Sequence, residues 1–299
     1  VGWGIYGTSE MQLAAYSMGE DSLTQLMLES YTHFLTCDLN ENDKNEIFVV
    51  KAASGEQTNS ASVFEFSNKG VLEVSSCRLD NAAKTFNEPI VSTLSSGKPA
   101  IYIDEIKGVG AITEVLFIDK GLLVNPLLQS DTVENVSTLR SVTFTIRDIN
   151  DDGILEIPVQ ENVPAVTKSE VNEKLYLTNW CSFNGEALTN QLISMVNVDD
   201  GYYYAIPSRW VGKIAVLKDT DNRIREIYLY DSEEMTVSES LLYIKAVNKK
   251  KWANGEYADE NCEEIMSNGE TTFICRISPA AEAEGITLKD VKSNFKLYE

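Results

Sequence analysis

The sequence of 299 residues contains a single histidine, His33. A serine or cysteine nucleophile activated by histidine needs this residue at one particular place, and most zinc enzymes use two or three imidazole ligands. These two classes of enzyme are therefore poor candidates. The sequence also contains no glycine-rich phosphate loop, no nucleophile elbow and no His-Glu zinc helix.

Long apolar runs are absent as well. No stretch of about 18 apolar residues is present, so we expect no transmembrane helix. The sequence begins at Val1 without a basic and apolar leader. We expect a chain trimmed from a longer one, tethered to a membrane, if at all, only through an N-terminal lipid anchor outside this sequence.

Disulfide pairs are not expected to organise the fold. The five cysteines lie far apart, and an odd number cannot all pair within one chain. Cysteine that forms no disulfide is among the most buried residue types, so we interpret these residues as small apolar side chains of the core.

Basic residues are scarce, with 25 against 46 acidic ones, which gives a net charge of −21. So negative a surface repels phosphate backbones and anionic lipid, and we expect no nucleic-acid partner. The excess is uneven: 12 basic and 29 acidic residues give −17 for residues 1–204, whereas 13 and 17 give −4 for residues 205–299. The two segments are therefore predicted to be separate domains.

One segment of the chain is repeated. Residues 34–49 align with residues 144–159, and Phe, Asp, Asn, Glu, Ile and Val occupy the same six offsets. Turn signals at 68–70, 119–121, 183–185 and, more weakly, 6–8 separate short runs of strand composition.

These features predict a mainly β fold in which each unit contains about four short strands, the scale of one propeller blade. We expect the tail of one unit in residues 1–20, then units at 21–80, 81–130 and 138–200. About three and a half propeller-like blades would fall short of the four to eight that close a propeller. A capping-box spacing also predicts a helix over 22–29.

Residues 205–299 read as a smaller α+β domain. Strands are expected at 213–217, 226–230, 241–244 and 272–277, followed by a helix that is capped at Thr287.

The second copy of the repeat has the residues of a calcium loop. Asp148, Asn150, Asp152 and Glu156 supply oxygen ligands at positions 1, 3, 5 and 9, Gly153 allows a sharp turn, and the carbonyl of Ile154 is a further ligand. Position 12, a glutamate in an EF-hand, is Val159. The flanks at 143–146 and 157–159 have strand composition, so the loop is predicted to join two strands.

The first copy offers a weaker version of the same loop. Its ligands would be Asp38, Asn40, Asn42 and Glu46, with Asp43 in place of the glycine. The alternative for both copies is a solvated turn, in which Asp, Asn and Gly are favoured for local hydrogen bonding alone. A third acidic turn, 219–223, is not predicted to bind metal because Arg223 occupies the fifth position.

The motif Asp-x-Asn-x-Asp-Gly-x-x-Glu-Ile of residues 148–157, with its copy at 38–47, resembles the FG-GAP or VCBS-type repeats of integrin-like β-propellers. Residues 98–103, 108–111 and 201–210 are similar to segments of uncharacterised envelope lipoproteins of anaerobic Gram-positive bacteria. The resemblance implies an exported bacterial protein with structural Ca²⁺ and a role in adhesion or ligand binding, and it implies no enzymatic activity.

We therefore expect a non-catalytic, calcium-stabilised scaffold at the cell surface or in the secreted fraction, with a protein or glycan ligand. The alternative is a polysaccharide hydrolase that uses two carboxyl groups and needs no histidine. Two tryptophans and three tyrosines would suit a platform for sugar rings, but aromatic residues at strand positions are more often core. These residues are Trp180, Tyr202, Tyr203, Tyr204 and Trp210.

Overall fold

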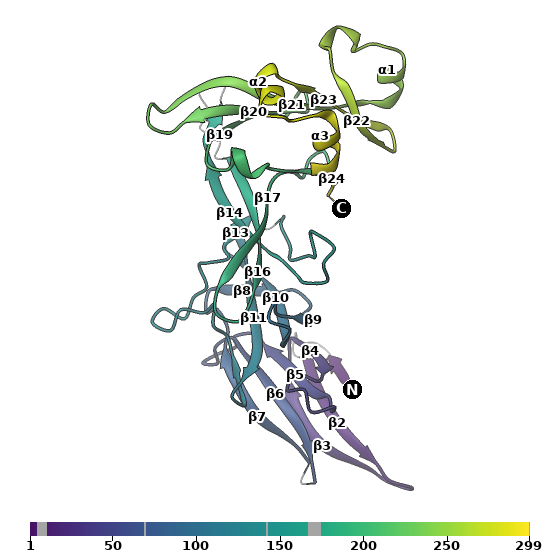
Figure 1. Cartoon of the computed structure of the whole chain (residues 1–299). Helices are drawn as coiled ribbons and strands as arrows, with labels where there is room; N and C mark the ends of the chain where they lie inside the picture. The colour runs from purple at the N-terminus through teal and green to yellow at the C-terminus, as the bar shows by residue number, and fades with distance from the viewer. Residues whose placement is uncertain (5–10, 69, 142, 167–174, 299) are drawn as a thin grey trace. The chain divides into compact units, whose positions relative to one another are not determined.

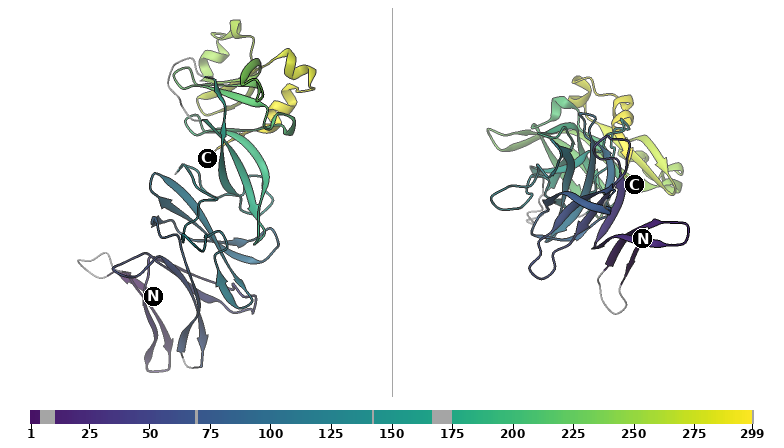
Figure 2. Two further views of the ribbon diagram at one scale, coloured as in Figure 1. Left: turned by 90° about the vertical axis from the view of Figure 1, so that its left-hand side faces the viewer. Right: turned by 90° about the horizontal axis from the view of Figure 1, so that it is seen from below.

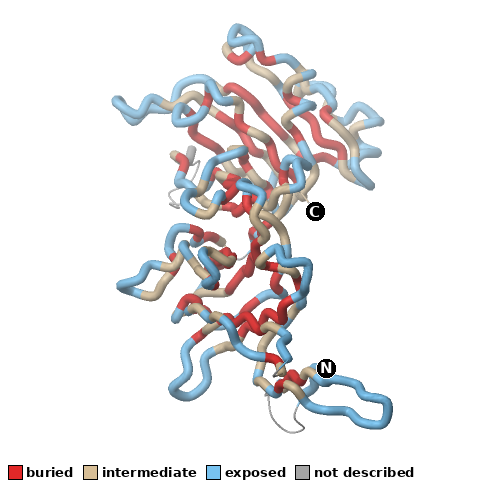
Figure 3. Tube along the Cα trace, turned by 60° about the horizontal axis from the view of Figure 1, so that its bottom comes forward, coloured by how far each residue is buried: buried red, intermediate tan, exposed pale blue. Residues whose placement is uncertain are grey.

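The computed structural model describes residues 1–4, 11–68, 70–141, 143–166 and 175–298. Within this part of the chain the structure is mainly β, as the sequence predicts, with antiparallel sheets and short helices (Figure 1). The described residues include no helix that is long and apolar enough to cross a bilayer. Buried segments follow the strands, whereas the turns are exposed (Figure 3).

The chain divides into two compact units. Unit 1 comprises residues 1–159 and 180–191, and unit 2 comprises residues 160–179 and 192–299. The chain passes from one unit to the other inside strands β14 (Ile157–Val163), β16 (Leu175–Phe183) and β17 (Leu188–Asn197).

Unit 1 begins with a three-stranded sheet of β1 (Gly2–Gly4), β2 (Met11–Met18) and β3 (Leu23–Ser30). The turn expected at 6–8 lies outside the described residues. The helix expected over 22–29 is wrong, because these residues form β3, which pairs with β2 from Leu23 to Ser30. A helix of eight residues is marginal on its own, and pairing with the neighbouring strand overrides the local capping signal.

A four-stranded antiparallel sheet follows, formed by β4 (His33–Cys37), β5 (Glu46–Lys51), β6 (Ser60–Ser67) and β7 (Gly70–Arg78). Its four strands and the turn before Gly70 agree with the unit expected in this part of the chain. The β2–β3 and β6–β7 hairpins lie side by side (Figure 2). One end of this sheet's face is covered by the hairpin β2–β3, where a small apolar cluster includes Leu13, Met27, Val49 and Phe64.

The next sheet has six strands rather than four. It contains β8 (Ala83–Phe86), β9 (Ile90–Thr93), β10 (Pro99–Lys107), β11 (Gly110–Asp119), β12 (Leu122–Val124) and β13 (Arg140–Ser141). Successive side chains of a strand point to opposite faces. Accordingly, Ile101 and Ile103 of β10 belong to one core cluster, and Tyr102 belongs to another.

Unit 2 contains most of a five-stranded sheet, in which β14, β16 and β17 are followed by β18 (Tyr202–Ala205) and β24 (Phe295–Leu297). Its second sheet contains β15 (Ala165–Val166), β19 (Ile214–Asp219), β20 (Ile224–Asp231), β21 (Thr236–Asn248), β22 (Glu263–Asn268) and β23 (Thr271–Ile277). The short helices are α1 (Lys249–Ala253), α2 (Pro279–Ala283) and α3 (Leu288–Asn294). The helix capped at Thr287 is confirmed, because Thr287 and Asp290 form a capping box.

The tyrosines and tryptophans weighed as a sugar platform are core residues. Trp180, Tyr202 and Tyr204 have no exposed surface, and Trp210 is 1% exposed. Tyr202 stacks on Phe295 with a centroid distance of 4.8 Å. The five tyrosines and tryptophans are therefore not available to a ligand at the surface.

All five cysteines lie among the described residues, and no disulfide joins any two of them. Cys37, Cys181 and Cys275 are buried, while Cys77 and Cys262 are partly exposed. Burial raises the pKa of every one of these thiols, to about 11 for Cys37 and about 12 for Cys77.

An ion pair is buried in unit 1. The Arg140 guanidinium donates to Asp104 Oδ1 at 2.6 Å, and their side chains are 0% and 5% exposed. Asp104 also accepts from Thr113 Oγ1 at 2.6 Å and from the Ile146 N–H at 3.0 Å. The ion pair thus ties β10 and β11 to the chain segment that leads into the second acidic loop.

We expect Asp104→Ala to lower the free energy of unfolding by about 3–5 kcal/mol, because it leaves the Arg140 charge buried without its partner. Asp119→Ala is the matched control: it removes an exposed ion pair with Lys98, which contributes about 0–1 kcal/mol. Urea unfolding of both variants measures the difference. If both variants lose the same free energy of unfolding, the buried ion pair contributes no more to stability than the exposed one.

Candidate functional site

Each of the two acidic loops leads directly into a strand. The first loop connects β4 to β5, and its ends are the paired residues Cys37 and Glu46. The second loop precedes β14, and its ends, Arg147 and Glu156, form an isolated antiparallel bridge. In both copies, therefore, the residue before the first aspartate pairs with the glutamate.

The second loop is closed by hydrogen bonds from its own backbone. Asp148 Oδ1 accepts the N–H of Asp152 at 3.0 Å, and Asp148 Oδ2 accepts that of Gly153 at 2.7 Å. Asn150 Oδ1 accepts the N–H of Asp152 at 3.1 Å, and Asp152 Oδ1 accepts that of Ile154 at 2.8 Å. The carboxylates thus hold the turn in a fixed conformation.

The first loop repeats three of these four contacts. Asp38 Oδ1 and Oδ2 accept the N–H groups of Asn42 and Asp43 at 3.0 and 2.8 Å. Asn42 Oδ1 accepts the N–H of Lys44 at 2.8 Å. The two loops, 110 positions apart in the sequence, therefore share most of one hydrogen-bond pattern, and of the four bonds only the one to Asn150 Oδ1 has no counterpart in the first loop.

The substitution of glycine by Asp43 does not change the loop. Asp43 has φ 64° and Gly153 has φ 87°, both in the left-handed region, and the preceding loop residues Glu41 and Asp151 match as well at 60° and 63°. Aspartate is one of the few residues with a side chain that adopts this conformation readily.

The glutamate of each loop is turned inward. Glu46 is 2% exposed and Glu156 is 0% exposed, and each accepts one backbone N–H from inside its loop: Leu39 at 2.8 Å and Ile149 at 3.0 Å. The other oxygen of Glu156, Oε1, is buried and has no hydrogen-bond partner. A cation inside the loop would satisfy it.

The pKa of Glu156 is raised from the ordinary 4.5 to about 7, mainly by burial and also by the carboxylates of Asp152 and Asp148, while the Ile149 N–H acts in the opposite direction. Burial likewise raises the pKa of Glu46, with Asp38 and Glu65 nearby. Both loops therefore hold more negative charge than their surroundings stabilise.

The candidate ligands lie together in each loop but do not form a complete metal-coordination site. Among the described residues, no three Asp, Glu, His or Cys side chains converge on one point that would hold a metal. Asn40 departs from its counterpart Asn150, because its amide donates to Glu65 Oε1 at 3.0 Å and its buried Oδ1 has no partner. Since a carboxylate oxygen has two lone pairs, the oxygens that accept N–H groups are still able to bind a cation.

The flank of the second loop differs from the prediction. Residues 143–146 do not form a strand. Their backbone is held by side chains instead, since Ile146 donates to Asp104 and the Phe144 carbonyl accepts from Arg140 Nε at 2.9 Å.

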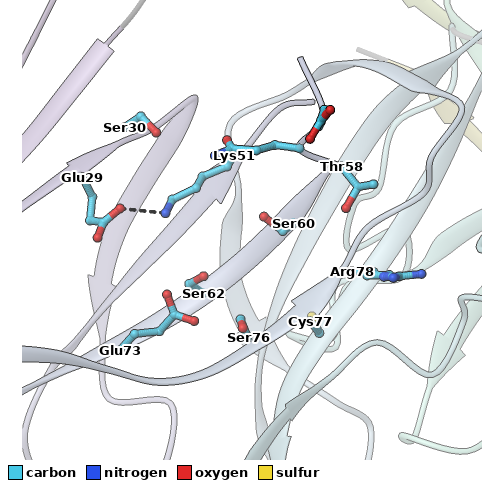
Figure 4. A pocket seen from close by; sticks show the side chains of 12 residues that line it. Glu29, Ser30, Lys51, Thr58, Ser60, Ser62, Glu73, Ser76, Cys77 and Arg78 are labelled. Atoms are coloured by element: carbon cyan, nitrogen blue, oxygen red, sulfur yellow. Dashed lines mark hydrogen bonds and ion pairs between the residues drawn. The ribbon is translucent and has the colours of Figure 1, made fainter. Parts of the chain in front are cut away.

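A second candidate site was not predicted from the sequence. A groove of about 670 Å³ lies between β3 and the face of the four-stranded sheet that the hairpin β2–β3 leaves uncovered (Figure 4). We call it the serine groove, because its floor carries Ser60, Ser62 and Ser76. Ser62 and Ser76 are directly paired across β6 and β7.

Charged side chains flank this floor. The strand register places Lys51, Ser60 and Arg78 in one row across β5, β6 and β7. Lys51 donates to Glu29 at 2.8 Å, whereas no described carboxylate lies within 4.0 Å of the exposed Arg78 guanidinium. Glu73 also lines the groove (Figure 4). The serine groove thus offers hydroxyls, a guanidinium and carboxylates to a polar ligand.

A polysaccharide hydrolase needs two carboxyl groups that a substrate can reach. The pair of neighbouring carboxyl groups in unit 1, Glu105 and Glu114, is fully buried. This pair therefore does not supply the catalytic site of the alternative function.

Comparisons of the chain with protein-family models, with curated proteins and with solved structures found no match. The function is therefore inferred from the sites themselves.

In calcium-free buffer, we expect the free energy of unfolding to fall as the pH rises from about 4.5 to about 7. The folded state binds more protons than the unfolded state in this window, because the pKa of Glu156 is raised on folding. Glu156→Gln is expected to reduce the slope of this profile, because Glu46 and the buried Glu105 also have raised pKa values. The exposed Glu186→Gln is expected to leave the slope unchanged. Urea unfolding at several pH values across this range measures the slope. If Glu156→Gln has the same slope as the parent protein, Glu156 is not a source of the pH dependence.

Proposed function

We propose that this protein is a non-catalytic, calcium-stabilised binding scaffold that acts outside the bacterial cell or on its envelope. The observation that supports it best is the shared conformation of the two acidic loops, down to the left-handed residues and the inward glutamate. A solvated turn requires no buried carboxylate, so turn formation alone leaves Glu46 and Glu156 unexplained.

Calcium suits the chemistry of these loops. Ca²⁺ takes six to eight oxygen ligands in flexible geometry. The second loop offers Asp148, Asn150, Asp152, the Ile154 carbonyl and Glu156, and the first offers Asp38, Asn40, Asn42 and Glu46. Bound Ca²⁺ would neutralise the acid groups and provide a partner for the orphan oxygen of Glu156.

In this proposal the sheets are units of an FG-GAP or VCBS-type repeat, and the loops rigidify the starts of β5 and β14. Support comes from the repeated loop and from the four antiparallel strands β4–β7 that surround the first copy. The propeller-like arrangement of such units belongs to the proposal and rests on this resemblance.

The ligand of the scaffold is proposed to be a glycan held in the serine groove. Hydroxyl groups of a sugar both donate and accept hydrogen bonds, and the groove supplies partners of both kinds. The two signs of charge along its walls match a neutral, hydroxyl-rich ligand better than a polyanion, which the net charge of −21 would repel.

Calcium is expected to raise the melting temperature of the metal-free protein. At a calcium concentration of 100 Kd, each site adds about 2.7 kcal/mol to the free energy of unfolding. The double variant Asp148→Ala, Asp152→Ala is expected to lose the contribution of the second loop. Asp221→Ala, in the acidic turn that is not predicted to bind metal, is the control. Calorimetry that detects no calcium binding at millimolar concentration would reject the proposal.

Arg78→Ala is expected to weaken glycan binding about tenfold or more, because a hydrogen bond to a charged group contributes about 1.5–3 kcal/mol. Lys84→Ala, an exposed residue of the same unit outside the groove, is the matched control. A glycan array identifies the ligand, and titration calorimetry compares the variants. An array without a bound glycan, or equal effects of the two variants, would exclude the serine groove.

A further inference from the structure

Two glutamates are buried next to each other between β10 and β11. Glu105 and Glu114 are both 0% exposed. Glu114 pairs with Ile103 in the register of the two strands, so Glu105 and Glu114 lie on the face that also carries Ile101 and Ile103. The pair is therefore embedded in apolar core, where two adjacent negative charges are strongly unfavourable.

The basic side chains near Glu105 and Glu114 form ion pairs with other acidic residues. Lys107 donates to Asp80 Oδ2 at 2.9 Å and to Glu134 Oε2 at 2.8 Å. Arg140 is paired with Asp104 at 2.6 Å. The two glutamates are thus left with two negative charges that no described side chain neutralises.

Several oxygens at this place have no donor. Both carboxylate oxygens of Glu105 and Oε2 of Glu114 are buried without a hydrogen-bond partner. Asn125 donates its amide to Glu114 Oε1 at 2.8 Å, and its own Oδ1 is likewise buried and without a partner. Buried polar groups without partners are rare in native proteins and commonly mark an ion or water.

We propose that Glu105, Glu114 and Asn125 form a third site for a divalent cation, calcium, that is independent of the two acidic loops. The uncompensated charge of two matches one divalent ion, and two carboxylates with an amide carbonyl are the hard oxygen donors that calcium prefers. The site lies in the part of the chain between the two acidic loops, where the sequence contains no calcium motif.

A shared proton is the competing explanation. One proton between Glu105 and Glu114 gives a partner to two of the four oxygens and leaves two without one, including the amide oxygen of Asn125. A cation bound by all three side chains would provide a partner for all four. Burial and the neighbouring Glu114 raise the pKa of Glu105, and the more distant charges of Asp80 and Asp104 add to this effect. Without the ion, the pair is therefore expected to take up a proton.

The experiment uses the full chain stripped of metal with a chelator. Equilibrium dialysis against calcium, with metal analysis, is carried out on the parent protein, on Glu105→Gln, and on a variant with both loops disabled by Asp38→Ala and Asp148→Ala. Glu88→Gln, an exposed glutamate in the same unit, is the matched control. We expect Glu105→Gln to bind one calcium ion fewer than the parent, Glu88→Gln to bind the same number, and the loop variant to retain one ion.

The loop variant separates the two proposals. Retention of one ion with loss of the others would support both of them, whereas a loop variant with unchanged stoichiometry would refute only the loop sites. If Glu105→Gln binds as many ions as the parent, the third site is wrong, and a stabilised Glu105→Gln with unchanged calcium binding would identify a shared proton instead. Glutamine has nearly the shape of glutamate, and Glu114→Gln provides a second, equally conservative test if the first variant does not fold.

Discussion

Burial of negative charge is the constraint on which unit 1 depends. Six carboxylates with at most 5% exposure lie in its interior, and each requires a donor or a cation. Asp80 and Asp104 obtain them from Lys107 and Arg140. Glu46 and Glu156 obtain one backbone N–H each from their loops. Glu114 Oε1 accepts from the Asp80 N–H and the Asn125 amide, whereas neither oxygen of Glu105 has a partner. The net charge of −21 is therefore partly an internal property of the core.

This constraint also explains the local geometry of the second loop. The Asp104–Arg140 pair takes the hydrogen bonds of Phe144 and Ile146, so the backbone before the loop has no ladder to join. The segment consequently reaches the loop as irregular chain, although its composition is that of a strand. A buried side-chain network has here displaced the pattern that β-propensity favours.

The mainly β class and several hairpins could be predicted, because alternating apolar residues and glycine turns are local signals. The turns before Gly70 and at Gly121 are examples of hairpin turns predicted in this way. The helix expected over 22–29 failed because β2 supplies a pairing partner that no local signal reveals. The loop residues were identified from their spacing alone, and their calcium remains a prediction.

The remaining features depend on register, which a single sequence does not reveal. Lys51, Ser60 and Arg78 form one row although 27 positions separate the first from the last. In the sequence, Glu105 and Glu114 resemble ordinary solvent-facing acids. The structure shows that core clusters cover both faces of their strands, β10 and β11. Their only sequence signal is that each lies, next to one other polar residue (Asp104 or Thr113), inside a mainly apolar run, Ile101 to Ile106 or Ala111 to Ile118.

The burial of the cysteines has a consequence for the handling of this protein. The thiolate is the reactive form, and the raised pKa values keep its population very small at neutral pH. In the folded chain the three buried thiols, Cys37, Cys181 and Cys275, are therefore protected from alkylation and from oxidative cross-linking, whereas an unfolded chain exposes them all at once. The rate at which a thiol reagent labels each of these three cysteines thus reports how often the strand around it opens, without any engineered probe.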